Sequence, residues 1–364
     1  MEKFEIIIIG AGPTGLRVAK ILAEAGKKVL VLEKNSVVGP KICAGGASPK
    51  VFQQGIPEDL IERKFNSIKI HFAGRTYERK SNEGYLLSTL DRENLGQWMA
   101  KEAEKSGAKI LTNTQVVSIK KDKVILKNNQ VYYFDYLIGA DGGTPLVRKY
   151  LKLPLKFALC FQYTLPQYFK NLEIFYEPKL FGAGYAWIFP HKNSTKIGCG
   201  SDLKFFNGNQ LKENFHFWLK KMGVNPVRNV ISNGVNYQEA KLESAIINYD
   251  YRGYQFGNIF LIGEAAGFVS GLNGAGIYPG LISGQEIARK ILNPNYRPKI
   301  TLMLFSQKLQ GKLLKILNIN QALVKYFMAV MVLYLFFSNR FFNLVHSVRK
   351  PFSNGVKKIF NGKL

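Results

Sequence analysis

The chain opens with a short apolar run that leads directly into a glycine-rich turn. Residues 6–9 are four isoleucines, and a Gly-x-Gly-x-x-Gly sequence occupies residues 10–15. A helix-like stretch follows at residues 16–25, and a second apolar run, residues 29–32, ends at Glu33. This order predicts a strand, a glycine turn, a helix and a second strand, which is the β-α-β unit of dinucleotide-binding folds.

Each glycine of the turn has a distinct expected task. Gly10 permits a tight turn, Gly12 lets the backbone approach a pyrophosphate, and Gly15 lets the helix pack closely on the strand. The free N–H groups at the start of the helix would bind the phosphates. Glu33 stands eighteen residues after Gly15, near the position of the acid that binds ribose hydroxyls. A glycine-rich turn alone is common, but here strand, helix and acid are all in register, which predicts nucleotide binding.

Two further segments repeat the arrangement of a strand followed by glycines and an acid. Residues 135–143 end in Gly-Ala-Asp-Gly-Gly, with the acid at Asp141. Residues 258–267 contain Gly-Glu-Ala-Ala-Gly and lead, after more glycines, to a predicted helix at about residues 277–291. Three such units predict a cofactor larger than a mononucleotide, bound across several loops.

The three motifs resemble those of FAD-dependent oxidoreductases of the aromatic-hydroxylase type. The resemblance implies that the first turn and Glu33 hold the ADP part of FAD, and that the middle and late motifs contact the pyrophosphate region and the ribityl chain. Residues 90–95 match a Leu-x-Arg-x-x-Leu stretch whose arginine, here Arg92, contacts the cofactor; read alone, Arg92 is a surface helix residue. Glu264 stands where the family usually has Asp. The implied cofactor-binding residues are Gly10, Gly12, Pro13, Thr14, Gly15, Glu33, Lys34, Ala44, Gly46, Arg92, Val116, Asp141, Gly263, Glu264, Gly276 and Ile277.

Two more motifs narrow the resemblance to the geranylgeranyl reductase family. Cys43 is followed by Ala-Gly-Gly, residues 185–190 read Tyr-x-Trp-x-Phe-Pro, and residues 198–200 read Gly-x-Gly. The similarity extends over residues 4–292, although the family commonly has Gly directly after the cysteine. It implies an FAD-dependent reductase that saturates isolated C=C bonds of polyprenyl lipids by hydride transfer from reduced flavin. The alternatives are an FAD-dependent monooxygenase of the same fold, acting on an aromatic or lipid substrate, and a flavin-stabilised scaffold without activity.

The substrate and catalytic residues follow from this resemblance and from the alternation along one segment. Tyr185, Trp187 and Phe189 are predicted to share one face of a strand and to line an apolar slot for the alkene. Packing between the sheet and the nucleotide domain would account for them equally. Cys43 is the candidate proton donor, because a thiol with a pKa of about 8.5 is mostly protonated at neutral pH. The simpler interpretation of Cys43 is a small residue that fills space under the ring.

The predicted fold class is α/β, with a Rossmann-type FAD-binding domain, an inserted antiparallel-sheet substrate domain and a C-terminal helical tail. The length of 364 residues agrees with more than one structural unit. We expect the discontinuous FAD-binding domain at 1–65, 92–150 and 251–300, the substrate domain at 66–91 and 151–250, and the tail at 301–364.

The tail is strongly basic and rich in aromatic residues. The net charge is +26, and the 78 residues after Glu286 contain fourteen Lys or Arg and no acid. The twelve apolar residues at 326–337 are shorter than the roughly 20 needed to span a bilayer. Residues 302–316 show the spacing of an amphipathic helix with a basic face, and 341–348 predict another short helix. We expect a membrane-surface anchor, with packing on the body as the alternative; nucleic acid is disfavoured because no recognition motif is present.

Three scattered cysteines and four histidines without ligand spacing predict neither a disulfide framework nor a metal site. The apolar run at the start of the chain leads straight into the phosphate turn, so we expect no signal peptide and a cytoplasmic protein, peripheral on the membrane. A second Gly-x-Gly-x-x-Gly turn after a strand is absent from the sequence. The electron donor, NADPH or an acidic ferredoxin, is therefore expected to dock transiently.

Overall fold

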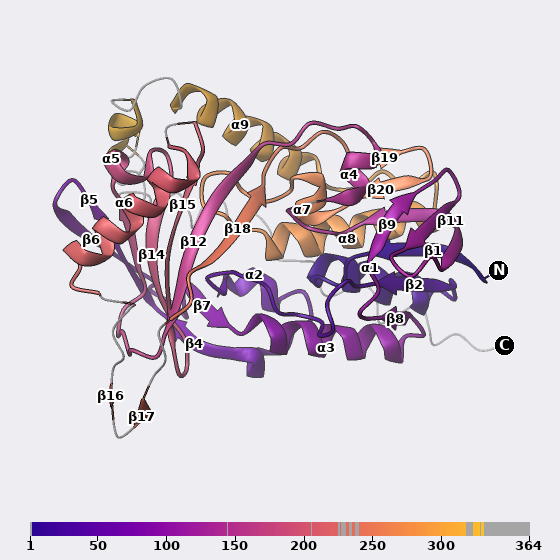
Figure 1. Ribbon diagram of the computed structural model, residues 1–364, viewed down its shortest axis with the longest axis horizontal. Helices are drawn as coiled ribbons and strands as arrows, with labels where there is room; N and C mark the ends of the chain where they lie inside the picture. The colour runs from indigo at the N-terminus through magenta and orange to yellow at the C-terminus, as the bar shows by residue number, and fades with distance from the viewer. Residues whose placement is uncertain are drawn as a thin grey trace, which may run out of the picture.

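An eight-stranded sheet holds the glycine turns (Figure 1). Its central strands run parallel, as the predicted β-α-β order requires, and antiparallel pairs are added at β19–β20 and in the β9–β10–β11 ribbon. In order across the sheet, the strands are β19 (Gln255–Phe256), β20 (Ile259–Leu261), β11 (Val131–Gly139), β1 (Glu2–Ile9), β2 (Val29–Leu32) and β8 (Lys109–Leu111). The ribbon strand β10 (Lys123–Leu126) pairs with β11 and with β9 (Val116–Ile119).

Both faces of this sheet are buried, which explains why β1 is apolar without alternation. Ile6 and Ile8 join a core cluster with residues of four helices, whereas Ile7 and Ile9 point into a second cluster with the β9–β10 ribbon. All four isoleucines are less than 8% exposed. The helices of the first cluster are α1 (Pro13–Glu24), the short α2 (Pro49–Phe52), α3 (Arg92–Lys105) and α8 (Ile277–Leu292).

A seven-stranded sheet forms the other large part of the molecule (Figure 1). It is antiparallel, as predicted for the inserted sheet, except for the parallel pair β13–β5. One face is covered by α5 (Pro178–Phe181) and α6 (Gly208–Lys221), whose Phe215 and Trp218 are fully buried. The strands in order are β18 (Glu243–Asn248), β12 (Phe157–Leu165), β15 (Thr195–Asp202), β14 (Tyr185–Pro190), β13 (Glu173–Tyr176), β5 (Ser67–Phe72) and β6 (Arg75–Lys80).

A small three-stranded sheet connects the two large ones through the segment that follows Cys43. Its middle strand β7 (Leu87–Leu90) pairs with β3 (Gly46–Ala47) and with β4 (Ile61–Phe65). The remaining short elements are a 3-10 helix (Glu58–Leu60), α4 (Leu146–Tyr150), α7 (Gly263–Ala266) and the hairpin β16 (Ile231–Ser232) and β17 (Val235–Asn236).

The computed structural model describes residues 2–143, 145–204, 206–224, 226, 240–317, 323–327 and 329–330, and the backbone of 231–232 and 235–236. Within these ranges the predicted fold class, α/β with a second sheet and a C-terminal helix, is confirmed. Most of the predicted apolar segment 326–337 and the whole predicted helix 341–348 lie outside the described residues. No helix in the described part of the chain is both long enough and apolar enough to cross a membrane.

The first helix of the tail, α9 (Thr301–Leu317), is amphipathic, as its spacing predicts. The predicted apolar stripe faces outward, because Leu302, Phe305, Leu309 and Ile316 are each more than half exposed. The buried side consists of Gln307, Leu314 and Leu317. In Figure 1, α9 lies along one side of the molecule, from α5 and α6 towards α7 and α8.

Candidate functional site

The glycine turn between β1 and α1 has the geometry that a bound phosphate needs. Gly10 has a φ of +102°, and a Cβ atom there would lie 2.5 Å from the carbonyl oxygen of Ala140. A Cβ atom on Gly15 would lie 2.2 Å from the Gly10 carbonyl oxygen, so α1 packs directly on the turn. Gly12, the N-cap of α1, has nothing within 4 Å of its Cβ direction. Gly10 and Gly15 therefore serve packing, and Gly12 leaves room for a ligand at the helix N-terminus.

Glu33 is held by backbone groups at the end of β2. Its Oε2 accepts a hydrogen bond of 2.9 Å from the Ala11 N–H, and its Oε1 accepts one of 2.9 Å from the Asn35 N–H. The carboxylate thus joins the end of β2 to the glycine turn. Each carboxylate oxygen can accept more than one hydrogen bond, so ribose hydroxyls remain compatible with these contacts.

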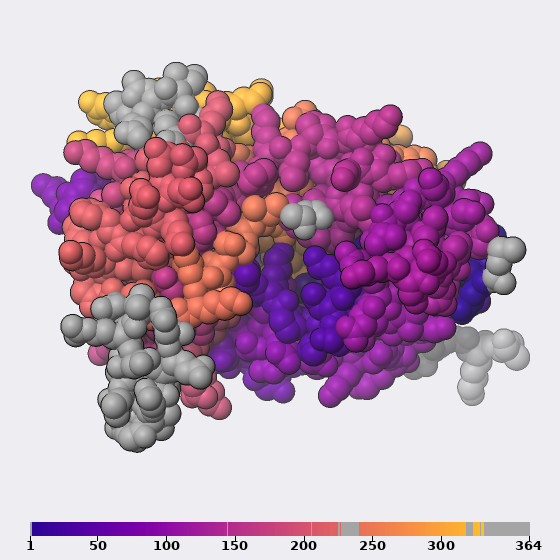
Figure 2. Space-filling model, in the orientation of Figure 1, coloured from indigo at the N-terminus to yellow at the C-terminus, as the bar shows by residue number. Residues whose placement is uncertain are grey.

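A groove of about 640 Å³ begins beside Glu33 and passes the glycine turn. Figure 2 shows the surface hollowed where the N-terminal segment (indigo) meets the segment around β18 (orange). A hollow of this size is within the range of cofactor sites, about 300–1,000 Å³. The predicted cofactor residues that line the groove are Gly10, Gly12, Glu33, Lys34, Arg92, Val116 and Asp141.

Two buried polar atoms in the groove have no hydrogen-bond partner among the described residues. They are Nε of Arg92 and Oδ1 of Asp141; the other oxygen of Asp141 accepts a hydrogen bond of 3.2 Å from the Val147 N–H. Burial raises the pKa of Asp141 to about 6, against the opposing effect of this hydrogen bond. Buried polar atoms in folded proteins are normally paired. A free donor and a free acceptor beside an open helix N-terminus fit a ligand that carries phosphates and hydroxyls.

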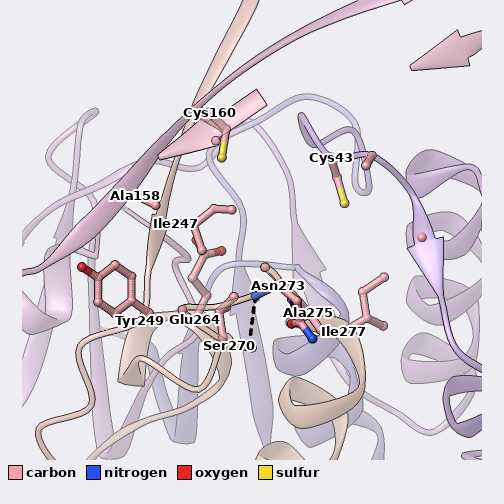
Figure 3. Close-up of a pocket in the computed structure, with 18 of the residues that line it drawn as sticks. Cys43, Ala158, Cys160, Ile247, Tyr249, Glu264, Ser270, Asn273, Ala275 and Ile277 are labelled. Atoms are coloured by element: carbon pink, nitrogen blue, oxygen red, sulfur yellow. Dashed lines mark hydrogen bonds between the residues drawn. The ribbon is translucent and has the colours of Figure 1, made fainter. Parts of the chain in front are cut away.

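The groove continues into a cavity of about 410 Å³, because Gly12, Lys41 and Arg92 line both. Figure 3 shows Cys43 and Cys160 projecting towards this space, with the segment from Asn273 to Ile277 on its other side. The predicted site residues that line the cavity are Gly12, Pro13, Thr14, Cys43, Ala44, Gly46, Arg92, Tyr185, Trp187, Phe189, Glu264, Gly276 and Ile277.

Cys43 lies in the turn before β3 and is half-buried. Its Sγ accepts a hydrogen bond of 3.4 Å from the Gly45 N–H. Burial raises the pKa of the Cys43 thiol, but the positive charges of Arg92 and Lys41 and this hydrogen bond outweigh burial and hold the pKa below its ordinary value. Burial instead raises the pKa of Cys160, which also lines the cavity, to about 12. Of these two thiols, Cys43 is the one suited to releasing a proton.

β14 supplies an aromatic wall. Tyr185, Trp187 and Phe189 line the cavity, whereas the alternate residues Ala186 and Ile188 pack against α6 on the other face. The Tyr185 hydroxyl donates a hydrogen bond of 2.7 Å to the Asn273 carbonyl oxygen. This bond ties the wall to the loop that precedes α8.

The wall also touches the turn after Cys43. A Cβ atom on Gly46 would lie 2.6 Å from Cε2 of Phe189, so glycine at this position brings the two together. The aromatic wall and the turn therefore form adjacent sides of one cavity.

Glu264 forms an ion pair with Lys41, which reaches it from the segment before Cys43. The other oxygen of Glu264 accepts a hydrogen bond of 3.3 Å from the Asn248 N–H. The longer side chain at this position thus has a protein partner. Gly263 and Gly15 lie behind the cavity wall: a Cβ atom on Gly263 would lie 2.5 Å from Oγ1 of Thr14, which does line the cavity.

Several lining residues were missed from the sequence. Lys41 stands only two positions before Cys43, and its charge next to the motif was an available signal. Asp202 and Tyr249 also line the cavity, where the Tyr249 hydroxyl donates a hydrogen bond to the Asp202 carboxylate, but no motif marks either residue. Leu314 reaches the cavity from α9, so the tail contributes to the site.

Comparison with known proteins agrees with a cofactor site at the groove. Residues 3–159 match a family model described as an FAD binding domain. The chain carries an FAD-binding domain. This domain contains the glycine turn, Glu33, Cys43, Arg92 and Asp141, that is, most of the groove and one side of the cavity.

Beyond the FAD-binding domain, the chain is similar to two named reductases over most of its length. It is 27% identical to the geranylgeranyl diphosphate reductase of Rhodobacter capsulatus over 305 residues, covering 79% of this chain and 74% of the relative. It is 25% identical to the digeranylgeranylglycerophospholipid reductase of Methanocaldococcus jannaschii over 344 residues, covering 85% and 83%. The predicted resemblance to the geranylgeranyl reductases, based on Cys43 and residues 185–190, is confirmed.

Solved structures share the fold of most of this chain. A geranylgeranyl bacteriochlorophyll reductase-like protein from Thermoplasma acidophilum has a TM-score of 0.68 at 20% identity, covering 90% of this chain and 87% of the other. The p-nitrophenol 4-monooxygenase of Pseudomonas putida has a TM-score of 0.61 at 16% identity, covering 82% and 83%. At these identities the likeness establishes the fold, and the chemistry has to be argued from the site.

Proposed function

We propose that the protein is an FAD-dependent reductase that saturates C=C bonds of a polyprenyl lipid. The observation that carries the proposal is the cavity in which Tyr185, Trp187 and Phe189 face the turn at Cys43 and the start of α8. An isolated alkene has no polar group to recognise, so its binding depends on apolar area and shape. The names of the two related reductases support a polyprenyl substrate.

The FAD-binding residues would divide the cofactor between groove and cavity. The open helix N-terminus at Gly12 and the guanidinium of Arg92 would hold the pyrophosphate, and Glu33 the adenosine ribose. When bound and reduced, FAD supplies a hydride to one alkene carbon. The aromatic wall would orient the prenyl chain and exclude water from the reacting bond.

The second hydrogen has to arrive as a proton, and we propose that Cys43, which lines the cavity, supplies it. A thiol whose pKa lies below the ordinary value is a stronger acid, and the thiolate left behind is stabilised by Arg92, Lys41 and the Gly45 N–H. One hydride on one carbon and one proton on the other saturate the bond. Solvent would then return the proton to Cys43 for the next turnover.

We further propose a transient electron donor, either NADPH or an acidic ferredoxin. Both are anionic, and a net charge of +26 would steer either towards the protein.

A lipid surface is the second partner that we propose. Leu302, Phe305 and Leu309 of α9 are exposed, and Lys308 and Lys312 alternate with them along the helix. Exposed apolar side chains interleaved with lysines suit an anionic membrane surface. Because Leu314 on the opposite side of α9 lines the cavity, peripheral binding there would bring the cavity close to its lipid substrate.

The test is the mass of the product. Purified protein with FAD, reduced by dithionite without oxygen, would be mixed with prenyl diphosphates, archaeal-type ether lipids, menaquinones and geranylgeranylated chlorophyll. We expect a gain of two hydrogens per reduced bond in at least one lipid. A gain of one oxygen in air with NADPH would instead establish the monooxygenase alternative. If no lipid changes mass under either condition, the proposal is wrong.

A further inference from the structure

One buried imidazole ring contacts the turn that carries Cys43. His191 directly follows β14 and is only 3% exposed. Its Nε2 lies 2.9 Å from the carbonyl oxygen of Ala44, and its Nδ1 contacts a carboxylate oxygen of Glu62 on β4. The ring also packs against Gly45, where φ is +77° and a Cβ atom would lie 2.6 Å from Cε1 of the ring.

These two contacts require one proton more than a neutral histidine and an ionised glutamate hold. The Ala44 carbonyl oxygen can only accept, so Nε2 of His191 must carry a hydrogen. An ionised carboxylate also only accepts, so the contact with Glu62 needs a second hydrogen, either on Nδ1 or on the carboxyl group. Both hydrogen bonds therefore exist together only while the His191–Glu62 pair is protonated.

The other attachments of the turn do not involve His191 or Glu62. The Gly45 carbonyl oxygen accepts a hydrogen bond of 3.0 Å from the Leu90 N–H, and the Ser88 hydroxyl donates one of 3.0 Å to Ala47. The end of β14 is likewise fixed, because the Thr89 hydroxyl donates a hydrogen bond of 2.8 Å to Pro190.

The charged and titratable groups around the ring come from several elements. Glu62 on β4 faces the ring directly. Cys43 lies in the turn that the ring contacts, and the positive charges of Lys41 and of Arg92 on α3 lower the pKa of its thiol. The ring is thus connected to the site through the Ala44 carbonyl, next to the thiol.

We propose that His191 is a positioning residue for Cys43. The His191–Glu62 pair holds residues 43–46 against β14 through the hydrogen bond from Nε2 to the Ala44 carbonyl oxygen, and without that bond the turn opens more easily. The consequence for catalysis rests on the proposed function, whereas the opening of the turn does not.

The test measures how fast Cys43 reacts with N-ethylmaleimide in the purified full-length protein at pH 7, by mass spectrometry of its peptide. Cys199 is buried on the opposite face of the seven-stranded sheet, so its protection reports that the protein stays folded. No flavin chemistry and no lipid is involved, and failure here would leave the reductase proposal standing.

The matched variant is Glu62→Gln. Its amide can donate to Nδ1 of a neutral His191, whose Nε2 then still donates to Ala44. We expect this variant to react at the wild-type rate, because both hydrogen bonds of the ring are kept. A rate that rises as much as in His191→Phe would show that the turn responds to the charge of Glu62 and not to the hydrogen bond of the ring, and it would overturn the proposal.

His191→Phe keeps an aromatic ring and removes both N–H groups. Its Cys43 should react about tenfold faster than in the wild type, the factor expected when one hydrogen bond leaves a local opening equilibrium, with Cys199 still protected. An unchanged rate would also overturn the proposal. If Cys199 becomes reactive, the variant has unfolded, and His191→Met, which also lacks a side-chain N–H group, is measured in its place with the same two outcomes.

Discussion

Asp141 shows how burial in the groove makes the ionised form of a single side chain unfavourable. Burial raises its pKa from 3.8 to about 6, so the folded protein binds this proton more tightly than the unfolded chain. Stability is therefore lost as the pH rises through the window from about 4 to 6, and the ionised side chain stays destabilising above it. A ligand that donates a hydrogen bond to Oδ1 would relieve this cost.

Asp141→Asn should stabilise the FAD-free protein in a pH-dependent way. Asparagine keeps an acceptor for the Val147 N–H and removes the buried charge. We expect the free energy of unfolding to rise by about 3 kcal/mol at pH 8 and by only about 1 kcal/mol at pH 4.5, from a shift of about two units. Urea unfolding at both pH values measures this. A gain of the same size at both would mean that ionisation is not its cause.

Cys43→Ala tests the proton donor. The variant should bind FAD normally, because the groove is untouched, and should lose turnover by about 10²-fold or more, as expected for removal of a general acid. Turnover with the lipid identified by mass spectrometry and the flavin absorbance of the purified protein are the measurements. The control is Cys199→Ala, which removes a thiol packed on the opposite face of the seven-stranded sheet. Equal turnover in the two variants would remove Cys43 from the mechanism.

At the scale of elements, the junction of β1 and α1 allows two glycines to be separated by function. Gly15→Ala places a methyl group against the Gly10 carbonyl and should cost about 3 kcal/mol of stability without FAD. Gly12→Ala meets open space, so stability should stay within about 0.5 kcal/mol while FAD affinity falls at least tenfold. Thermal unfolding and fluorescence titration with FAD distinguish the two effects. The opposite pattern would show that the turn does not face the cofactor.

Local patterns were sufficient to predict this junction, because strand, turn, helix and Glu33 interact within one contiguous segment. The same holds for β14, whose alternation indicated that Tyr185, Trp187 and Phe189 share a face. Asp202 and Tyr249 could not be predicted, because the two residues are 47 apart in sequence and no local rule brings them together. The contacts of His191 with Glu62 and Ala44 are non-local in the same way, since they join residues 129 and 147 apart in sequence.

The orientation of α9 was also beyond the sequence. Periodicity shows which residues share a helix face, but not which face meets the protein. Here two glutamine contacts fix it: the Gln307 amide donates to the Phe268 carbonyl oxygen at 3.0 Å, and the Ser270 hydroxyl donates to Gln310 at 2.7 Å. The apolar stripe at Leu302 and Phe305 is consequently left outside.

For the whole molecule, charge and exposed apolar area predict where it binds lipid. Phe305 on α9 and Phe217 on α6 are matched, because both are exposed phenylalanines on helices, at 66% and 61%. Phe305→Ser should weaken sedimentation with anionic liposomes about tenfold, since burying such a side chain contributes about 1.5–3 kcal/mol. Phe217→Ser should not change the sedimentation, and added salt should weaken the binding of both variants to the liposomes. Equal partitioning of the two variants would contradict binding through α9.

Leu314 lines the cavity whereas Leu302 and Phe305 are exposed on the outer side of α9, so the thickness of one helix, roughly 10 Å, lies between this part of the cavity and the outside. If the proposed function holds, a prenyl chain would not have to enter the cavity over its whole length. Most of its length would stay dissolved in the bilayer while one olefin at a time is presented to the flavin. Successive bonds would then be saturated processively, without release of half-finished lipid into water.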